Sequence, residues 1–378
     1  MRKELKPIWI YLENGIFLEA KSFGMEGTKT GEIVFNTSMT GYQEIMSDPS
    51  YAGQFVVFTM PEIGIVGCND NDMESKTIYA SGMFARSLNE IPSNFRSTQS
   101  LPEFLKKYES MGICDIDTRY LTKMIRDNGP KMMIASTEVS DPQKLKAMLE
   151  ASPRIEEVNY IEKVSTPKPY VHVKGVWSAE AQSYNETPKR IGKKILAVDL
   201  GIKRNILNEL CEVGLDVEVV PHDFNAADVI ARYKTGEIHG LFLSNGPGDP
   251  LILKSEAAQI SKLIEAKVPI FAICLGHQLL SIAHGFPTYK LKFGQHGGNH
   301  PVKNMKNNIV EITTQNHNYN VPDDICKVAR ITHVNLFDNT IEGLEYNDSP
   351  IFSVQHHPEA SAGPQESRYI FQEFANRL

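Results

Sequence analysis

The chain has 378 residues, of which 41% are hydrophobic and 22% are charged, a composition that fits a globular protein. A chain of this length is too long for one ordinary core, so two domains are expected. The formal net charge of −7 and the pI of about 5.9 argue against a general nucleic-acid-binding surface.

The first 60 residues are predicted to be rich in strands. Asn14-Gly15 is a strong hairpin signal between the apolar runs Pro7–Leu12 and Ile16–Ala20. Residues 31–36 and 54–59 predict further strands. The polar segment 37–50 between them predicts a long ordered loop or a short helix with loops. It is either a functional loop or a solvated connection, and its residues alone favour the connection. The charged N-terminus predicts neither a signal peptide nor a membrane span, so a cytoplasmic location is expected.

Residues 70–150 are predicted to be mainly helical. Apolar residues recur at helical spacing in Leu101–Tyr108 and in Asp117–Gly129. The second of these segments starts with a capping Asp or Thr and ends at a glycine. A third helix is expected over residues 142–151, with Asp141 as its N-cap and proline at its first position.

The proline-rich and polar residues between 165 and 192 are typical of a linker. We therefore predict an N-terminal domain over residues 1–190, which includes this linker, and a C-terminal domain over residues 193–378.

The C-terminal domain is predicted to alternate strands and helices. Strands are expected at 195–198, 215–220, 240–244 and 268–273, and helices at 203–213, 226–233, 256–266 and 275–284. This alternation predicts an α/β fold with a doubly wound, mostly parallel sheet, whose ligands bind beyond the carboxyl ends of the strands. Extended segments are expected at 289–300, 309–314, 328–333, 340–346 and 351–354, followed by a helix at 367–377.

Cys274 lies where the apolar run Val268–Ile273 stops and the predicted helix Leu275–His284 begins. A cysteine on a sharp strand-to-helix turn is typical of a nucleophile elbow. There the helix N-terminus favours a thiolate, and the N–H group of Leu275 can face an oxyanion. A buried structural cysteine is an equally good interpretation of this stretch alone. The other four cysteines, Cys68, Cys114, Cys211 and Cys326, have no CxxC or zinc-finger spacing, so free thiols in a reducing compartment are expected.

A nucleophilic cysteine needs a base, and the base needs a group that orients it. His357 and Glu359 flank Pro358 directly after the predicted strand at 351–354, so a carboxylate could hold the imidazole. Successive side chains alternate across a strand, so His356 and His357 point to opposite sides, and only one of them can easily face Cys274. Two histidines beside a carboxylate also fit a metal site, although no HExxH spacing supports it.

Two glycine-rich segments are further candidates. Asn245–Pro250 follows the predicted strand 240–244, and its glycines let the backbone approach a ligand and complete an oxyanion hole. It is equally typical of a tight turn, and it lacks the GKS/T and GxGxxG patterns of phosphate loops. The Gly- and His-rich segment Gly294–Pro301 fits a metal site or, better, a flexible or substrate-lining loop.

The segments Phe271–Leu280 and Gln355–Glu359 resemble the class I glutamine amidotransferases, which have a flavodoxin-like fold. The resemblance extends to the small, glutamine-hydrolysing subunits of carbamoyl phosphate synthetases and covers nearly the whole chain. The further motifs that carry it are Phe35–Ile45, Asp48–Tyr51, Ser93–Arg96, Asp115–Arg119, Gly201–Asn205, Leu243–Pro250 and Gly297–Pro301. The N-terminal motifs are the discriminating ones, because other amidotransferases lack that domain.

The resemblance implies a Cys274, His357 and Glu359 triad that hydrolyses glutamine through a thioester. It further implies oxyanion N–H groups from Leu275 and Gly246. The residues implied to hold glutamine are Ser50, Gly246, Gly248, Leu275, Gln278, Asn316, Asn318 and Tyr319. Asn318 replaces a glycine that is frequent in the family, and asparagine is the best non-glycine residue for a positive φ.

The family also implies a large partner subunit that binds ATP with Mg²⁺ or Mn²⁺ and receives ammonia to make carbamoyl phosphate for arginine and pyrimidine synthesis. No cofactor or metal is expected in this chain. A free-standing glutaminase is the alternative to a paired subunit. Another amidotransferase or a γ-glutamyl hydrolase is disfavoured by residues 1–190. A non-catalytic scaffold subunit is disfavoured by the intact triad.

Overall fold

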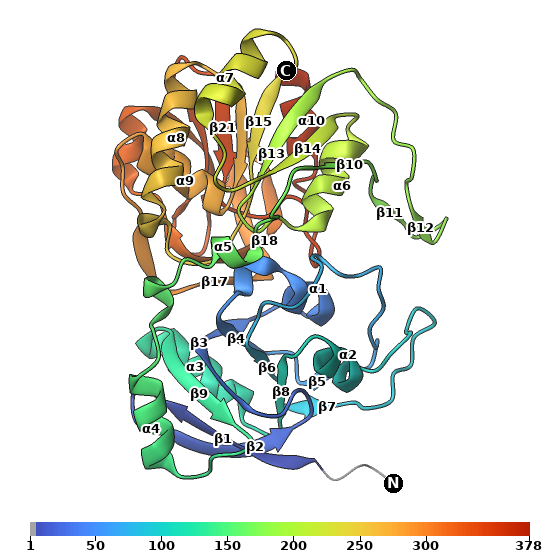
Figure 1. The fold of residues 1–378 in the computed structure, drawn as a ribbon, viewed down its shortest axis with the longest axis vertical. Coiled ribbons are helices and arrows are strands. Elements are labelled where there is room, and N and C mark those ends of the chain that lie inside the picture. Colours follow the sequence, from blue (N-terminus) through green and yellow to red (C-terminus); the bar gives the residue numbers. More distant parts are fainter. Residues whose placement is uncertain (1–4) are drawn as a thin grey trace. The chain divides into compact units, whose positions relative to one another are not determined.

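The computed structural model describes residues 5–378, which divide into two compact units (Figure 1). The first unit contains the residues up to Tyr160 together with Lys292–His296, and the second contains Ile161–Leu291 and Gly297–Leu378. Residues 1–4, part of the charged N-terminus discussed above, lie outside the described residues.

The first unit is built on a closed barrel with the strand order β1-β2-β8-β6-β4-β3-β9. Its strands are β1 (Lys6–Leu12), β2 (Phe17–Ser22), β3 (Thr28–Asn36), β4 (Gln54–Phe58), β6 (Gly82–Phe84), β8 (Met111–Cys114) and β9 (Lys131–Ser136). The short strands β5 (Glu62–Ile63) and β7 (Ser87–Leu88) pair separately. The predicted hairpin is confirmed: β1 and β2 pair antiparallel, and Gly15 has a φ of 88°.

Three of the barrel strands were not expected from the sequence. We predicted a helical region over residues 70–150, but β6, β8 and β9 lie within it and complete the barrel. All residues of β6 and β8 are buried, so these short strands show no alternation of apolar and polar side chains.

The helices of the first unit are α1 (Tyr42–Ser47), α2 (Leu101–Lys107), α3 (Thr118–Asn128) and α4 (Pro142–Glu150), and Pro49–Tyr51 forms the 3₁₀ turn η1. The predicted ends of α3 are confirmed: the Asp117 side chain accepts a hydrogen bond from the Tyr120 N–H group, and Gly129 follows the last turn. Leu121 and Ile125 of α3 pack with the barrel residues Ile33 and Phe55 in one hydrophobic cluster.

Because α1 lies within it, the segment 37–50 contains a short helix with loops, which is one of the two forms expected for it.

Residues 161–192 cluster with the second unit rather than standing apart as a linker. They contain α5 (Ile161–Val164), β10 (Tyr170–His172), β11 (Trp177–Ser178) and β12 (Ser183–Tyr184), whereas η2 (Ile155–Glu157) precedes them in the first unit. Strand β10 pairs antiparallel with β14 and becomes an edge strand of the large sheet. The polar composition that suggested a linker thus belongs to an edge segment.

The second unit has a ten-stranded sheet in the order β10-β14-β13-β15-β16-β21-β20-β19-β17-β18. Its further strands are β13 (Lys194–Asp199), β14 (Asp216–Pro221), β15 (Gly240–Leu243), β16 (Ile270–Ile273), β17 (Tyr289–Asn304), β18 (Val310–Asn320), β19 (Ala329–Asn335), β20 (Ile341–Tyr346) and β21 (Ile351–Val354). Strands β14, β13, β15, β16 and β21 are parallel neighbours, whereas β20 and β19 run antiparallel to their partners.

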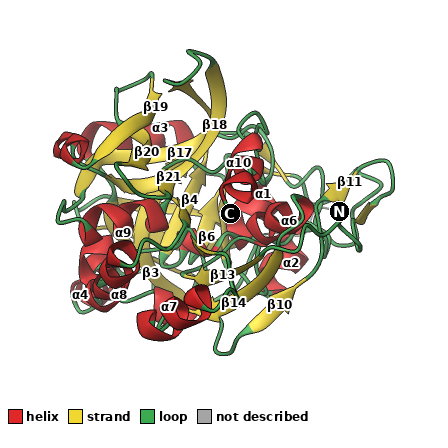
Figure 2. Cartoon of the chain, turned by 90° about the horizontal axis from the view of Figure 1, so that it is seen from above, coloured by secondary structure: helices red, strands yellow, loops and turns green. Residues whose placement is uncertain are grey.

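Helices cover both faces of this sheet, as expected for a doubly wound fold (Figures 1 and 2). They are α6 (Arg204–Glu212), α7 (Ala226–Lys234), α8 (Lys254–Glu265), α9 (Leu275–Ala283) and α10 (Tyr369–Arg377), with 3₁₀ turns η3 (Pro250–Ile252) and η4 (Asp323–Lys327). One hydrophobic cluster joins the sheet to α7, α8 and α9, and another joins its other face to α6 and α10. Within residues 5–378, no helix combines the length and the apolar character needed to cross a bilayer.

Candidate active site

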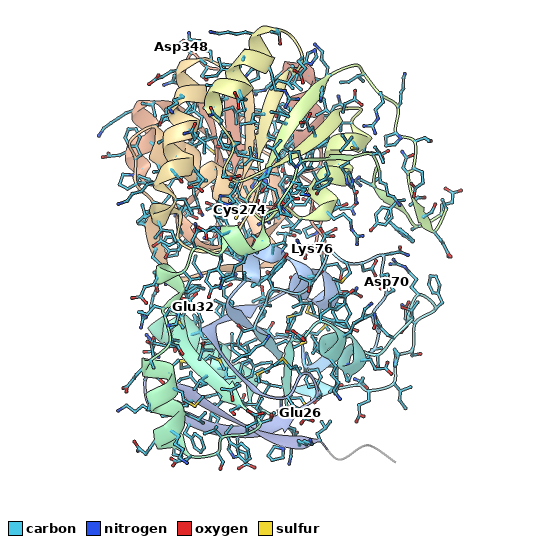
Figure 3. The ribbon with its side chains drawn as sticks, in the orientation of Figure 1. Glu26, Glu32, Asp70, Lys76, Cys274 and Asp348 are labelled. Carbon is cyan, nitrogen blue, oxygen red and sulfur yellow. The ribbon has the colours of Figure 1, made fainter. Side chains whose placement is uncertain are left out.

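Cys274 occupies a sharp turn between β16 and α9 (Figure 3). Its φ of 53° and ψ of −105° lie in a region that non-glycine residues rarely adopt. The turn is held from the neighbouring parallel strand, because the Cys274 N–H group donates to the Val354 carbonyl at 2.9 Å. Strand, strained turn and helix together form the elbow that the sequence predicts, and such strain is typical of functional positions.

Gly276 makes this elbow possible. A Cβ atom at this position would lie 2.5 Å from the Leu243 carbonyl oxygen and 2.8 Å from the Leu243 Cβ. The Gly276 N–H group donates to the Ser244 carbonyl at 3.0 Å. Only glycine therefore lets α9 start this close to the end of β15, which brings the loop after β15 beside the cysteine.

His357 and Glu359 form the pair expected from their spacing. His357 Nδ1 lies 2.7 Å from Glu359 Oε1, and both side chains are almost completely buried. Burial alone would lower the pKa of His357, but the negative charge of Glu359 and the interaction with the Cys274 side chain outweigh burial and raise this pKa. Nδ1 is occupied by Glu359, whereas no hydrogen bond to a group other than the Cys274 side chain holds Nε2 among residues 5–378, so Nε2 is the nitrogen available to exchange a proton with the thiol.

Lys203 is a buried cation beside the pair, and no role was expected for it from its residue type or spacing. Its Nζ donates to Glu359 Oε1 at 3.0 Å and also to the Ala360 carbonyl, and its side chain is 2% exposed. Burial would raise the pKa of Glu359, but Lys203 and His357 lower it, so the carboxylate stays ionised. The only signal in the sequence was its place in the motif Gly201–Asn205.

A second residue of that motif also holds Glu359. The Asn205 Nδ2 atom donates to the Glu359 carbonyl at 2.6 Å. The loop after β13 is in turn joined to the loop after β15, because the Lys203 N–H group donates to Asn245 Oδ1 at 3.2 Å. The parallel strands β13, β15, β16 and β21 thus end at one edge of the sheet, where their loops meet.

The residues predicted to hold glutamine fall into two groups. In the second unit, the Asn316 carbonyl lies 3.6 Å from Cys274 Sγ. Gln278 Nε2 donates to the carbonyl of Tyr319 at 2.9 Å and to Gln355 Oε1 at 3.0 Å. Leu275 begins α9, Gly246 and Gly248 lie in the loop after β15, and Asn318 lies on β18.

Ser50 belongs to the first unit, on η1, where its N–H group donates to Asp48 Oδ1 at 2.9 Å. Its predicted contact with glutamine stays a prediction, as do the glutamine contacts of the other seven residues.

The alternative metal sites gain no support from the geometry. The segment Gly294–Pro301 is part of strand β17 rather than a flexible loop. In the part of the chain that the structure describes, no group of three or more His, Cys, Asp or Glu side chains is arranged to hold a metal ion. The five cysteines are free thiols, as predicted.

Gly246 provides a test of the loop after β15. An alanine Cβ at this position would lie 2.2 Å from the Leu200 carbonyl oxygen and 2.7 Å from Leu275 Cδ2, so the loop would have to move. For Gly246→Ala we expect kcat for glutamine hydrolysis to fall by about 10²-fold, the loss typical of a misplaced oxyanion donor. Gly236→Ala is the control for backbone strain alone, because the Gly236 φ of 76° disfavours alanine while a Cβ there meets nothing within 4 Å, so kcat should be kept. Wild-type kcat in Gly246→Ala would exclude this loop from the site.

The chain matches one family model in each of its two halves. Residues 10–135 match the family described as "Carbamoyl-phosphate synthase small chain, CPSase domain", and residues 196–377 match "Glutamine amidotransferase class-I". The carbamoyl phosphate synthase small chain of Campylobacter jejuni is 60% identical over 98% of this chain and 99% of its own length. The chain belongs to the carbamoyl phosphate synthase small-chain family.

Other members of this family match over a similar extent. The Helicobacter hepaticus small chain is 58% identical over 98% of both chains. The small chain of Escherichia coli O6:H1 is 42% identical over 98% of this chain and 97% of its own. Family membership identifies the chain as the glutamine amidotransferase subunit of a carbamoyl phosphate synthase, with its amidotransferase domain in the second unit.

Proposed function

We propose that this chain hydrolyses L-glutamine to glutamate and ammonia with a Cys274, His357 and Glu359 triad. The observation that carries the proposal is the convergence of these residues at one sheet edge, with His357 Nδ1 held 2.7 Å from the buried Glu359. Ammonia passes to a large subunit, which binds ATP with Mg²⁺ or Mn²⁺ and makes carbamoyl phosphate from bicarbonate. The chain acts in the cytoplasm, in arginine and pyrimidine synthesis.

In the first half of the reaction, His357 Nε2 takes the proton of Cys274, and the thiolate attacks the side-chain amide carbon of glutamine. Glu359 accepts the Nδ1–H hydrogen bond, which fixes the imidazole and stabilises its charged form. The oxyanion faces the N–H groups of Leu275 and Gly246. The carbon–nitrogen bond then breaks, His357 gives its proton to the nitrogen, and ammonia leaves a γ-glutamyl thioester on Cys274.

In the second half, His357 removes a proton from water, and the resulting hydroxide attacks the thioester carbon. Collapse of this second tetrahedral intermediate breaks the carbon–sulfur bond. Glutamate leaves, and the proton on His357 returns to Cys274. Lys203 keeps Glu359 ionised throughout, so the imidazole keeps its orientation in both halves.

Transfer of the amide nitrogen tests this function directly. The chain and its large subunit are incubated with glutamine labelled with ¹⁵N at the side-chain amide, with bicarbonate, ATP and unlabelled ammonia. We expect the carbamoyl phosphate to be enriched in ¹⁵N above the free ammonia pool, because ammonia made at Cys274 is delivered to the partner. Product enrichment equal to that of the free pool would contradict delivery. Absence of glutamate formation would contradict the hydrolysis.

A further inference from the structure

Glu342 on β20 is a completely buried carboxylate that the proposed mechanism does not use. Its oxygens accept hydrogen bonds from two amide groups, Gln315 Nε2 at 3.0 Å and Asn335 Nδ2 at 3.3 Å. Among residues 5–378, its ion-pair partners within 4.0 Å are histidines: His356 Nδ1 at 3.7 Å and His317 Nε2 at 3.9 Å. An ionised carboxylate at this depth is costly unless one of these rings carries a positive charge.

The orientation of the Gln315 side chain can be assigned from its neighbours. The Thr313 hydroxyl donates its hydrogen to the His300 carbonyl at 3.0 Å, so towards Gln315 it can only accept. The Gln315 group 3.1 Å from this hydroxyl is therefore the NH₂ group, which also donates to Glu342. The Gln315 oxygen must then face His317.

This orientation determines the protonation of His317. Its Nδ1 lies 2.8 Å from the Tyr319 carbonyl, which can only accept, so Nδ1 carries a hydrogen. Its Nε2 lies 3.1 Å from the Gln315 oxygen, which also only accepts, so Nε2 carries a hydrogen too. An imidazole with hydrogens on both nitrogens is an imidazolium cation.

The surrounding groups agree with a cation at His317 and an anion at Glu342. The other titratable groups nearby are His277 on α9, His356 after β21 and Lys290, whose Nζ lies 5.9 Å from the Tyr319 ring centre. His277 is buried, and the positive charge of His317 adds to burial in lowering its pKa. His277 is therefore neutral, and the negative charge that balances His317 comes from Glu342.

We propose that Glu342 is the counterion of a permanently protonated His317, and that this pair positions the glutamine-binding segment of β18. The inference rests on the proposed function, because Asn316, Asn318 and Tyr319 are expected to hold glutamine. The charged ring holds the Tyr319 carbonyl from one side, while Gln278 Nε2 donates to the same oxygen from α9 at 2.9 Å. Glu342 touches no reacting atom and is a positioning residue.

The charge of His317 is measured first, without turnover. The full chain is labelled with ¹⁵N-histidine, and the His317 signals are identified by their absence in His317→Gln. We expect both ring nitrogens to keep imidazolium chemical shifts between about pH 6 and 9, although an unperturbed histidine loses its proton near pH 6.5. In Glu342→Gln, which keeps the shape of the side chain and removes its charge, we expect His317 to become neutral at pH 7. A neutral His317 in the wild-type chain overturns the proposal.

The second readout is glutamine hydrolysis by the complex with the large subunit. For Glu342→Gln we expect KM for glutamine to rise at least about tenfold, the scale of one charge-assisted hydrogen bond, with little change in kcat. Glu311→Gln is the matched control, because Glu311 on β18 is also a buried carboxylate, but it is held by Ser367 Oγ at 2.6 Å and the Tyr369 hydroxyl at 2.8 Å.

An equal rise in KM in Glu311→Gln, or an unchanged KM in Glu342→Gln, overturns the positioning role. If Glu342→Gln does not fold, the wild-type spectrum decides whether His317 is charged. If the wild-type complex fails to hydrolyse glutamine, the proposed function is contradicted instead. The measured charge of His317 still stands in that case.

Discussion

Replacing Cys274 with serine should abolish glutamine-dependent carbamoyl phosphate synthesis by the complex while leaving ammonia-dependent synthesis intact. The expected loss is at least about 10³-fold, because a serine hydroxyl beside the same base is a far weaker nucleophile than a thiolate. Ammonia supplied from solution needs no thioester, so the large subunit keeps its own activity. Both rates are measured on the same preparation, with glutamine and then with an ammonium salt as the nitrogen donor.

Cys211→Ser is the matched control for this experiment. Cys211 is also buried, but it lies within α6, and its thiol donates to the His172 carbonyl at 3.4 Å. The control should retain glutamine-dependent synthesis. Full activity of Cys274→Ser with glutamine would show that the elbow cysteine is not the nucleophile. Loss of both activities would point to damage of the complex instead.

Lys203→Met should lower both the stability of the chain and its glutaminase rate. The substitution leaves Glu359 as a buried carboxylate that has lost its permanent cation, and breaking such a pair costs about 3 kcal/mol or more. The carboxylate also loses one of the two cations that keep it ionised and aimed at His357, so kcat should fall with stability. Denaturant unfolding and glutamine hydrolysis measure the two effects.

The cost of Lys203→Met should depend on pH. In the folded wild type the pKa of Glu359 is lowered, whereas an unfolded glutamate titrates near about 4.3. The stabilisation from this carboxylate is therefore present above that pH and is lost as the pH falls through the lowered folded pKa. The stability difference between wild type and variant should be largest near neutral pH and should shrink below about pH 4.

A partly exposed ion pair in the same sheet provides the control for Lys203→Met. Lys194 Nζ lies 2.7 Å from Glu218 Oε2, but the Lys194 side chain is 36% exposed. Lys194→Met should cost less than about 1 kcal/mol, as exposed pairs do. Equal costs for the two variants would show that Lys203 does not compensate a buried charge.

Local features of the chain could be predicted well. The hairpin at Asn14-Gly15, the capped ends of α3 and the alternating strands and helices after residue 193 all follow from neighbouring residues. Each of these depends on turn chemistry or on a periodic apolar pattern within one segment. The pairing of His357 with Glu359 is of the same kind, because two residues of separation leave little freedom for where the carboxylate can reach.

Features that depend on distant segments could not be predicted from local patterns. Strands β6 and β8 are short and buried throughout, so only pairing with their barrel neighbours makes them strands. Strand β10 lies in a segment that suggested a linker because prolines and polar residues surround it, and its pairing with β14 makes it part of the sheet.

The sequence alone located Cys274 at the end of one strand, and it placed His357 and Glu359 directly after a second strand. Tertiary structure decided which charges surround them. Lys203, 156 residues before Glu359, reaches its carboxylate, and Glu342 lies among histidines of other segments. The first contact follows from parallel strands whose ends meet at one sheet edge. The second follows from the antiparallel pairing of β20 with its neighbours, where Glu342 is buried. Because an unpaired charge is costly in the buried interior, each of these ion pairs affects stability and protonation. No single stretch of sequence encodes this burial.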